Sequence, residues 1–192
     1  MKNRLQEISK KAALNASHAI SKLIDIPVGL EISYSETKKV DELSPIIDPE
    51  EIVAGIYLPV TGTLKGASLL VFPKETAFAL SDLLVKREPG TTRSLSELDK
   101  SALKEMGNIL SGNYLAVLSD ELQAKIIEHI PQFSFDMFGA IISQIISKFV
   151  LEAEEVLIIE IEFIFKTVRL KGYFILLFRL EEMHAILESL KD

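Results

Sequence analysis

Hydrophobic residues recur along this chain with two different periods, which separate predicted helices from predicted strands. Residues 5–21 and 97–122 repeat apolar side chains every three or four positions, and this spacing predicts two long amphipathic helices. The linkers 61–66 and 166–172 are tight enough to join strands as antiparallel hairpins. The strands that they would join are short runs rich in Ile, Val, Leu and Phe, at 52–60, 67–72, 155–165 and 173–180.

The two halves of the chain resemble each other. Each half contains a long helix, an intervening segment, two strands and a closing helix, and neither half obviously buries its own sheet faces. We therefore expect one domain over residues 1–192, built from two repeats (about 1–88 and 95–192) with internal pseudo-twofold symmetry. The aligned pairs include Leu64 with Leu170, Lys65 with Lys171, Gly66 with Gly172, Glu7 with Glu105 and Asn15 with Asn113.

Local signals mark the boundaries of two further elements. The segment 87–97 is rich in Pro, Gly, Thr and Ser, which is typical of a linker between the halves. At its end Ser96 is followed three residues later by Asp99, a variant of the capping box that starts a helix. After Pro131, the mostly apolar segment 133–152 predicts another helix.

Charge and composition exclude several classes of protein. The chain has 28 acidic and 21 basic residues, a net charge of -7, and no basic run, so nucleic-acid binding is not expected. Cysteine is absent, which removes disulfides and thiolate chemistry. The N-terminus lacks the apolar core of a signal peptide, and every apolar run is shorter than the ~20 residues of a membrane span. We expect a cytoplasmic protein without membrane insertion.

The predicted helix 97–122 has a polar side with unusual chemistry. At 3.6 residues per turn, Ser101, Glu105, Asn108, Gly112 and Ser119 fall on one face, opposite an apolar face of Leu103, Met106, Leu110 and Val117. An amide can orient a water and a carboxylate can pair with a cation on a partner, while a glycine lets another surface come close. The alternative is an ordinary solvated face, or a helix broken at its glycines.

Other candidate groups carry less chemistry. Glu160 and Glu162 alternate with apolar residues, so a strand with one polar face is favoured over a metal or acid–base pair. His18, His129 and His184 lie far apart without ligand spacing, and no metal site is expected.

Ser101, Glu105 and Asn108, followed at a fixed distance by Pro131, resemble the signature of the CheC/CheX/FliY phosphatases, which dephosphorylate the chemotaxis response regulator CheY. The flanking stretches 102–119 and 136–143 are also similar to CheC. The resemblance implies an α/β (α+β) fold, in which two long helices lie on one face of a central, mainly antiparallel sheet. It also implies that Asn108 holds a water in line with the acyl phosphate and that Glu105 pairs with the receiver's lysine. The Mg²⁺ would belong to the CheY substrate, so no cofactor of the chain's own is expected.

Many CheC members carry this motif twice, and here the first copy is degenerate. Asn3 stands at the serine position and Glu7 is retained, but Lys10 replaces the catalytic asparagine. Leu14 stands where Gly112 leaves room, and Ser33 replaces the proline. A lysine cannot accept the water's hydrogen bond, so we predict one functional site, in the second repeat.

The resemblance also implies a second partner, the receptor deamidase CheD. The helix after Pro131, around Asp136, Met137 and Phe138, is a candidate docking surface, and the alternative is a core helix. Two other functions remain open: a binding module that sequesters CheD or a receiver, and a structural part of the flagellar or archaellar switch. We expect no additional assembly domain of the FliY type.

Overall fold

One mixed sheet-and-helix domain accounts for residues 2–149, 155–166, 168–178 and 184, which a computed structural model of the chain describes. Seven strands form one sheet in the order β1-β6-β7-β3-β2-β4, with β5 also paired to β2, and the pairings among the described strands are antiparallel. The strands are β1 (Gly29–Lys39), β2 (Ile52–Gly62), β3 (Gly66–Pro73), β4 (Ile126–Glu128), β5 (Gln132–Met137), β6 (Glu155–Ile164) and β7 (Arg169–Phe178).

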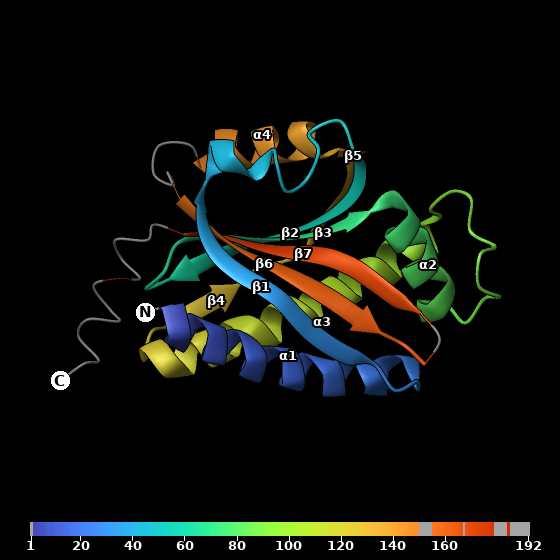
Figure 1. The fold of residues 1–192 in the computed structure, drawn as a ribbon, viewed down its shortest axis with the longest axis horizontal. Coiled ribbons are helices and arrows are strands. Elements are labelled where there is room, and N and C mark those ends of the chain that lie inside the picture. The colour runs from blue at the N-terminus through green and yellow to red at the C-terminus, as the bar shows by residue number, and fades with distance from the viewer. Residues whose placement is uncertain (1, 150–154, 167, 179–183, 185–192) are drawn as a thin grey trace.

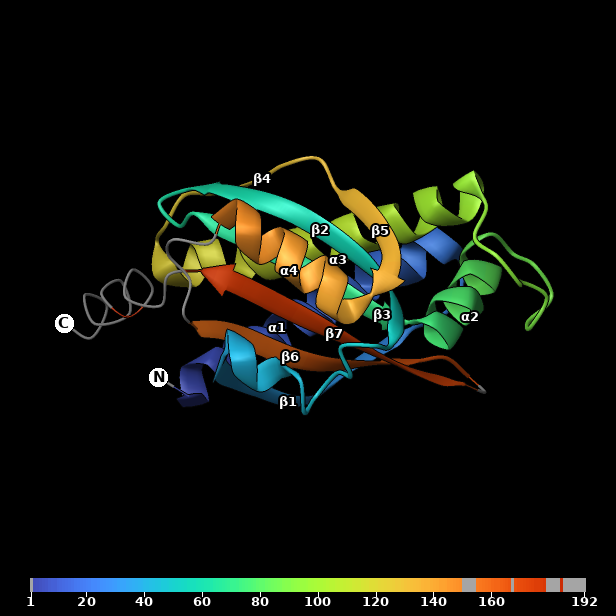
Figure 2. The same cartoon turned by 90° about the horizontal axis from the view of Figure 1, so that it is seen from above.

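Helices cover both faces of the sheet. Figure 1 shows α1 and α3 side by side on one face, α4 on the other face, and α2 at one end. Seen from above in Figure 2, β1 and β5 lie at opposite edges of the sheet. The helices are α1 (Lys2–Ile24), α2 (Lys74–Leu84), α3 (Glu97–Leu122), α4 (Phe138–Phe149) and the short 3-10 helix η1 (Val40–Leu43).

The core has two layers, one on each side of the sheet. Alternation along β2 sends Ile56 and Leu58 toward α1 and α3, and sends Val53 and Tyr57 toward α4. Because both faces are covered, the central strands are hydrophobic almost continuously, and β3 is buried from Gly66 to Phe72.

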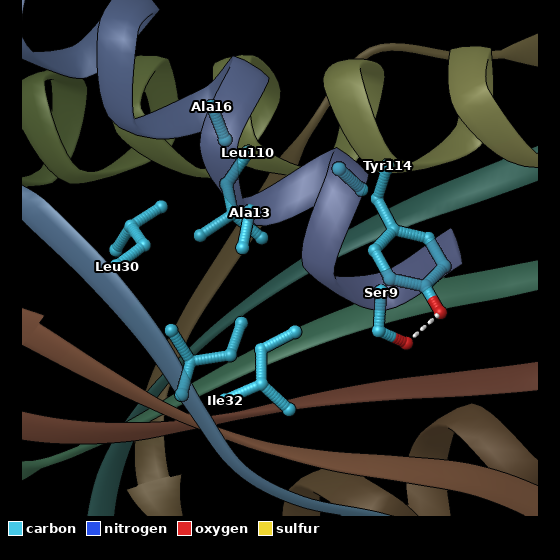
Figure 3. Close-up of a pocket in the computed structure, with 9 residues that line it drawn as sticks. Ser9, Ala13, Ala16, Leu30, Ile32, Leu110 and Tyr114 are labelled. Carbon is cyan, nitrogen blue, oxygen red and sulfur yellow. Dashed lines mark hydrogen bonds between the residues drawn. The ribbon is translucent and has the colours of Figure 1, made fainter. Parts of the chain in front are cut away.

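The two long helices pack against each other through small side chains. Ala13 and Ala16 of α1 lie against Leu110 and Tyr114 of α3 around a small apolar space (Figure 3). The Ser9 and Tyr114 hydroxyls are 2.8 Å apart and share a buried hydrogen bond between the two helices. The Tyr114 ring also packs against Phe174 of β7, with ring centroids 5.1 Å apart, so this side chain contacts both α1 and the sheet.

The sequence predicted the central elements correctly. Both long helices, the first closing helix (α2) and the strands β2, β3, β6 and β7 form, and each strand pair is an antiparallel hairpin. Glu160 and Glu162 make cross-strand ion pairs with Lys171 and Arg169, as expected of a strand with a polar face. The strand order is symmetric about the central β3–β7 pair, while the two-repeat division stays a prediction. The second closing helix was predicted over 179–190, nearly all of which lies outside the described residues.

One predicted boundary is wrong. The helix expected over 133–152 begins at Phe138, and residues 133–137 form part of β5. The cause is long-range pairing, since Phe133 lies opposite Ile56 of β2 and Met137 lies opposite Ile52. Among the described residues, no helix is long and apolar enough to cross a membrane.

Replacing Gly107 should destabilise the domain. A Cβ at Gly107 would lie 2.8 Å from Cγ2 of Ile56, a fully buried branched side chain that has nowhere to move. We expect Gly107→Ala to lower the free energy of unfolding by about 1–3 kcal/mol, although alanine is the better helix former. Urea denaturation of Gly107→Ala beside Gly112→Ala measures this, because a Cβ at Gly112 would meet only the end of the Glu128 side chain, at 3.3 Å. Equal stability of both variants would contradict the packing explanation.

Candidate functional site

Four residues predicted to share the solvent-exposed face of α3 lie on that face. Ser101 and Glu105 are exposed, and Asn108 and Gly112 are half-buried, so all four reach the surface along one side of the helix. We call these four residues the α3 stripe. Side chains three or four positions apart on a helix are about 5–6 Å apart at Cβ, which places the Glu105 carboxylate and the Asn108 amide beside each other. The expected core residues Leu103, Met106, Leu110 and Val117 are buried.

The polar groups of the α3 stripe are not engaged elsewhere. Within the described part of the chain, the Asn108 amide makes no hydrogen bond and the Glu105 carboxylate makes no ion pair. Asn113, five residues further on, shows the contrast, because its amide Nδ2 donates to the Ile109 carbonyl at 2.7 Å. Asn113 therefore serves the helix, whereas Asn108 and Glu105 are available to a partner.

Packing explains the other weak helix formers of α3. Gly107 is buried over Ile56 of β2, where no side chain fits. Ser111 is fully buried, and its hydroxyl lies 2.6 Å from the Ser68 hydroxyl of β3. Because these positions have structural reasons, the weak helix formers that need another explanation are Asn108 and Gly112, both on the α3 stripe.

A buried polar network holds the beginning of α3. The capping box is confirmed: the Ser96 hydroxyl accepts from the Asp99 backbone N–H at 3.3 Å, and the Asp99 carboxylate accepts from the Ser96 N–H at 2.8 Å. Arg87 donates to Asp99 and bridges it to Asp82, whose nearest oxygen is 3.8 Å away. We call Asp82, Arg87, Ser96 and Asp99 the α3 clamp, because together they hold the first turn of α3.

Pro131 belongs to a different segment from the α3 stripe. It stands between β4 and β5, on the edge segment that pairs with β2, and is half-buried. Since proline has no N–H, it suits a break between two short edge strands. Glu128, three residues earlier, is placed by the pairing of β4 with β2, opposite Val60.

Glu128 is the site residue that the sequence analysis missed. Its Oε2 lies 3.3 Å from the position of a Cβ at Gly112, so the carboxyl borders the room that this glycine leaves. Burial raises the pKa of Glu128 to about 7, against the opposing effect of a hydrogen bond from Ser111. The signal was present, since Glu128 follows Ile126 by two residues and shares its side of the strand.

The degenerate first motif occupies the corresponding exposed side of α1. Asn3 lies in the first turn of α1, Glu7 and Lys10 are exposed, and Leu14 is 57% exposed. Lys10 and Leu14 line a groove of about 540 Å³ between α1 and the edge strand β1. A cation and a bulky apolar side chain therefore stand where the α3 stripe has an amide and a glycine.

The segment proposed as a docking surface is divided between two elements. Asp136 and Met137 are exposed in β5, whereas Phe138 is buried at the start of α4. Ile141 and Ile145 of α4 are also buried against the sheet, as expected of a core helix, while docking of CheD on this segment stays a prediction.

Comparison with known proteins adds a family context to this geometry. The model of the CheC-like family matches residues 98–131, a span that holds the α3 stripe, Glu128 and Pro131. The CheY-P phosphatase CheC of Bacillus subtilis (strain 168) is 30% identical over 143 residues, which cover 73% of this chain and 68% of that protein.

Solved structures share the fold. Thermotoga maritima FliY matches with a TM-score of 0.81 and 19% identity, covering 98% of this chain and 96% of that one. CheX of Borrelia burgdorferi, solved in a complex with CheY, BeF3 and Mg²⁺, matches with a TM-score of 0.57 and 17% identity, covering 90% of this chain and 96% of that one. Both matches support the α/β fold with a mainly antiparallel sheet.

Proposed function

The chain belongs to the CheC-like family, and from this premise we propose that it hydrolyses the aspartyl phosphate of the chemotaxis response regulator CheY through one site, on α3. The observation that carries the proposal is the unengaged pair of Glu105 and Asn108, one turn apart within the region that matches the family model. Support also comes from a relative that is itself named a CheY-P phosphatase.

The chemistry at this site is positioning. A receiver docks on the α3 stripe, where Gly112 keeps the surface low enough for close approach. The Asn108 amide enters the receiver's site and holds a water in line with the scissile phosphorus–oxygen bond. Holding a nucleophile in the attack geometry supplies a large part of a phosphoryl-transfer barrier, so one well-placed amide is a sufficient contribution.

Glu105 fixes the orientation of the receiver. Its carboxylate pairs with the lysine of the receiver's active site, one helical turn from Asn108. The Mg²⁺ needed to neutralise the phosphoryl group comes with the receiver, so this proposal requires no metal ligand from the chain.

The corresponding face of α1 is inactive in this proposal. Lys10 carries only donors, so it cannot accept a hydrogen bond from an attacking water. On α1, Leu14 stands at the position that corresponds to Gly112 and is 57% exposed, so a bulky side chain fills the room that the glycine leaves at the α3 site. The chain therefore acts with a single site.

The test is the decay of phosphorylated CheY with the chain present at a small fraction of the CheY concentration. Faster decay with many turnovers per chain supports the phosphatase. If decay is unchanged both alone and with CheD added, the phosphatase proposal is wrong, and a non-catalytic module for CheD or a receiver replaces it.

Removing the Glu105 carboxylate should weaken docking more than chemistry. We expect Glu105→Ala to raise KM for phosphorylated CheY about tenfold, as loss of an interfacial ion pair worth roughly 1.4 kcal/mol would do, with a smaller change in kcat. Steady-state phosphate release measures both constants. The matched control is Asp120→Asn, an exposed acid about 22 Å further along the helix, which should leave KM unchanged. A KM equal to that of wild type in Glu105→Ala would remove Glu105 from the site.

A further inference from the structure

Glu128 occupies a place where an apolar residue would be expected. It pairs with Val60 of β2, a core residue, and points to the side of the sheet that α3 covers. Its Oε1 is sealed from solvent and has no hydrogen-bond partner within the described residues. A buried acceptor without a partner costs stability, so the presence of Glu128 at this position calls for a functional reason.

The surroundings of Glu128 are polar but uncharged. A hydrogen bond joins its carboxyl to Ser111, which in turn contacts Ser68, and both serines are fully buried. Gly112 on α3 covers it only with backbone. These neighbours form a small buried cluster directly beneath the α3 stripe.

No charged group neutralises this carboxyl in the described part of the chain. The facing positions on α3, β2 and β3 are Ser111, Gly112, Val60 and Ser68, none of which titrates near neutral pH. Other titratable groups nearby point elsewhere: Glu105, Asp120 and Lys125 are exposed, and the His129 ring hydrogen-bonds with Thr61 at 2.9 Å.

Docking on the α3 stripe would bury Glu128 further. Gly112 lies one turn from Asn108, so a receiver that covers Asn108 also covers the opening over the Glu128 carboxyl. The receiver also brings the negative charge of its phosphoryl group close to the Glu128 carboxyl. Desolvation and like charge both disfavour the ionised form of a carboxyl, so the complex holds a proton more tightly than the free chain.

We propose that Glu128 is a positioning residue of this site, neutral when the phosphorylated receiver docks and opposing docking when it is ionised. The inference rests on the proposed function, because it assigns a regulator to the same site. Linkage gives the direction of the pH dependence of docking. A group that gains protons on binding favours binding at low pH, and this contribution is lost as pH rises through the pKa of the group in the free chain.

The observable is the pH dependence of KM. Because burial raises the pKa of Glu128 to about 7 in the free chain, the group changes its charge between pH 6 and pH 8. We expect the ratio of the wild-type KM to the Glu128→Gln KM for phosphorylated CheY to rise about tenfold from pH 6 to pH 8, with little change in the kcat ratio. Dividing by the variant's KM removes the receiver's own pH dependence. Glu121→Gln is the control, since its carboxylate pairs with Lys11, which holds its pKa below the ordinary value.

Each outcome separates the two proposals. A flat KM ratio overturns the role of Glu128 while leaving the phosphatase intact, whereas no acceleration by wild type at any pH overturns both. A second measurement needs no variant: carbon-13 NMR of the Glu128 carboxyl in the wild-type chain should show titration near pH 7. Titration in the ordinary range for glutamate would overturn the inference even if Glu128→Gln failed to fold.

Discussion

Asn108→Ala is expected to lower kcat for dephosphorylation of CheY at least about 100-fold, the usual cost of deleting one preorganised hydrogen-bonding group at a reacting centre. The reason is that the Asn108 amide makes no hydrogen bond within the described chain, so its proposed role is only to hold the attacking water in position. Affinity for CheY should change no more than a few-fold, because Glu105 and the open surface at Gly112 remain. Single-turnover decay and a binding isotherm, measured on the same samples, separate the two effects.

A matched control is available on the same helix. Asn113→Ala removes the same type of side chain five residues further on, where the amide donates to the Ile109 carbonyl instead of facing a partner. This variant should keep the wild-type rate. If both variants lose activity equally, the cause is damage to α3, and the catalytic assignment of Asn108 fails.

Asp82→Ala is expected to cost about 3–5 kcal/mol of stability, because it removes the acceptor at the centre of the α3 clamp. Asp82 is only 1% exposed. Its carboxylate accepts from the backbone N–H of Thr91 at 2.9 Å and from the Thr92 hydroxyl at 2.6 Å. The variant would leave these donors without their acceptor and would remove one of the two carboxylates that Arg87 bridges. Thermal unfolding should show a decrease in Tm of roughly 10 °C, whereas Glu88→Ala, an exposed acid in the same loop, should show almost none.

The same clamp predicts how stability depends on pH. Burial by itself would raise the pKa of Asp82, but hydrogen bonds from Thr92 and Thr91 outweigh it and hold the pKa below the ordinary value. For Asp99, bonds from Ser96 and Arg87 likewise overcome burial and lower the pKa. A carboxyl whose pKa is lowered in the folded state stabilises the fold at pH values above its pKa in the unfolded chain, which is about 4. This stabilisation is lost as pH falls through the lower pKa of the folded state. Asp82→Ala should therefore weaken the acid dependence of Tm, and an unchanged dependence would contradict the clamp.

Elements that a local pattern of apolar residues marks were predictable from the sequence. Elements that form only through long-range strand pairing were not. The strands β2, β3, β6 and β7 are apolar runs covered on both faces, and composition alone marks such runs. By contrast, β1 is an edge strand with polar residues at alternate positions, and only its pairing with β6 defines it. The strand β5 was mistaken for helix because its apolar residues continue directly into α4.

The candidate site shows the same division. The capping of α3 by Ser96 and Asp99 and the exposure of the α3 stripe follow from residues close in sequence, and both were predicted. Glu128 was missed because its burial depends on β4 pairing with β2 and on α3 packing above it. The clamp was also missed, since Arg87 bridges Asp82 and Asp99 only after the loop between α2 and α3 folds back.

The central claim is that this chain has one working site, on α3, and it is tested most directly by comparing Asn108→Ala with Lys10→Ala in one assay. Decay of phosphorylated CheY is followed with wild type, each variant and no added chain, at equal concentrations. The account predicts that Lys10→Ala matches wild type and that Asn108→Ala matches CheY alone. Wild-type decay with Asn108→Ala, or loss of activity in Lys10→Ala, would contradict it.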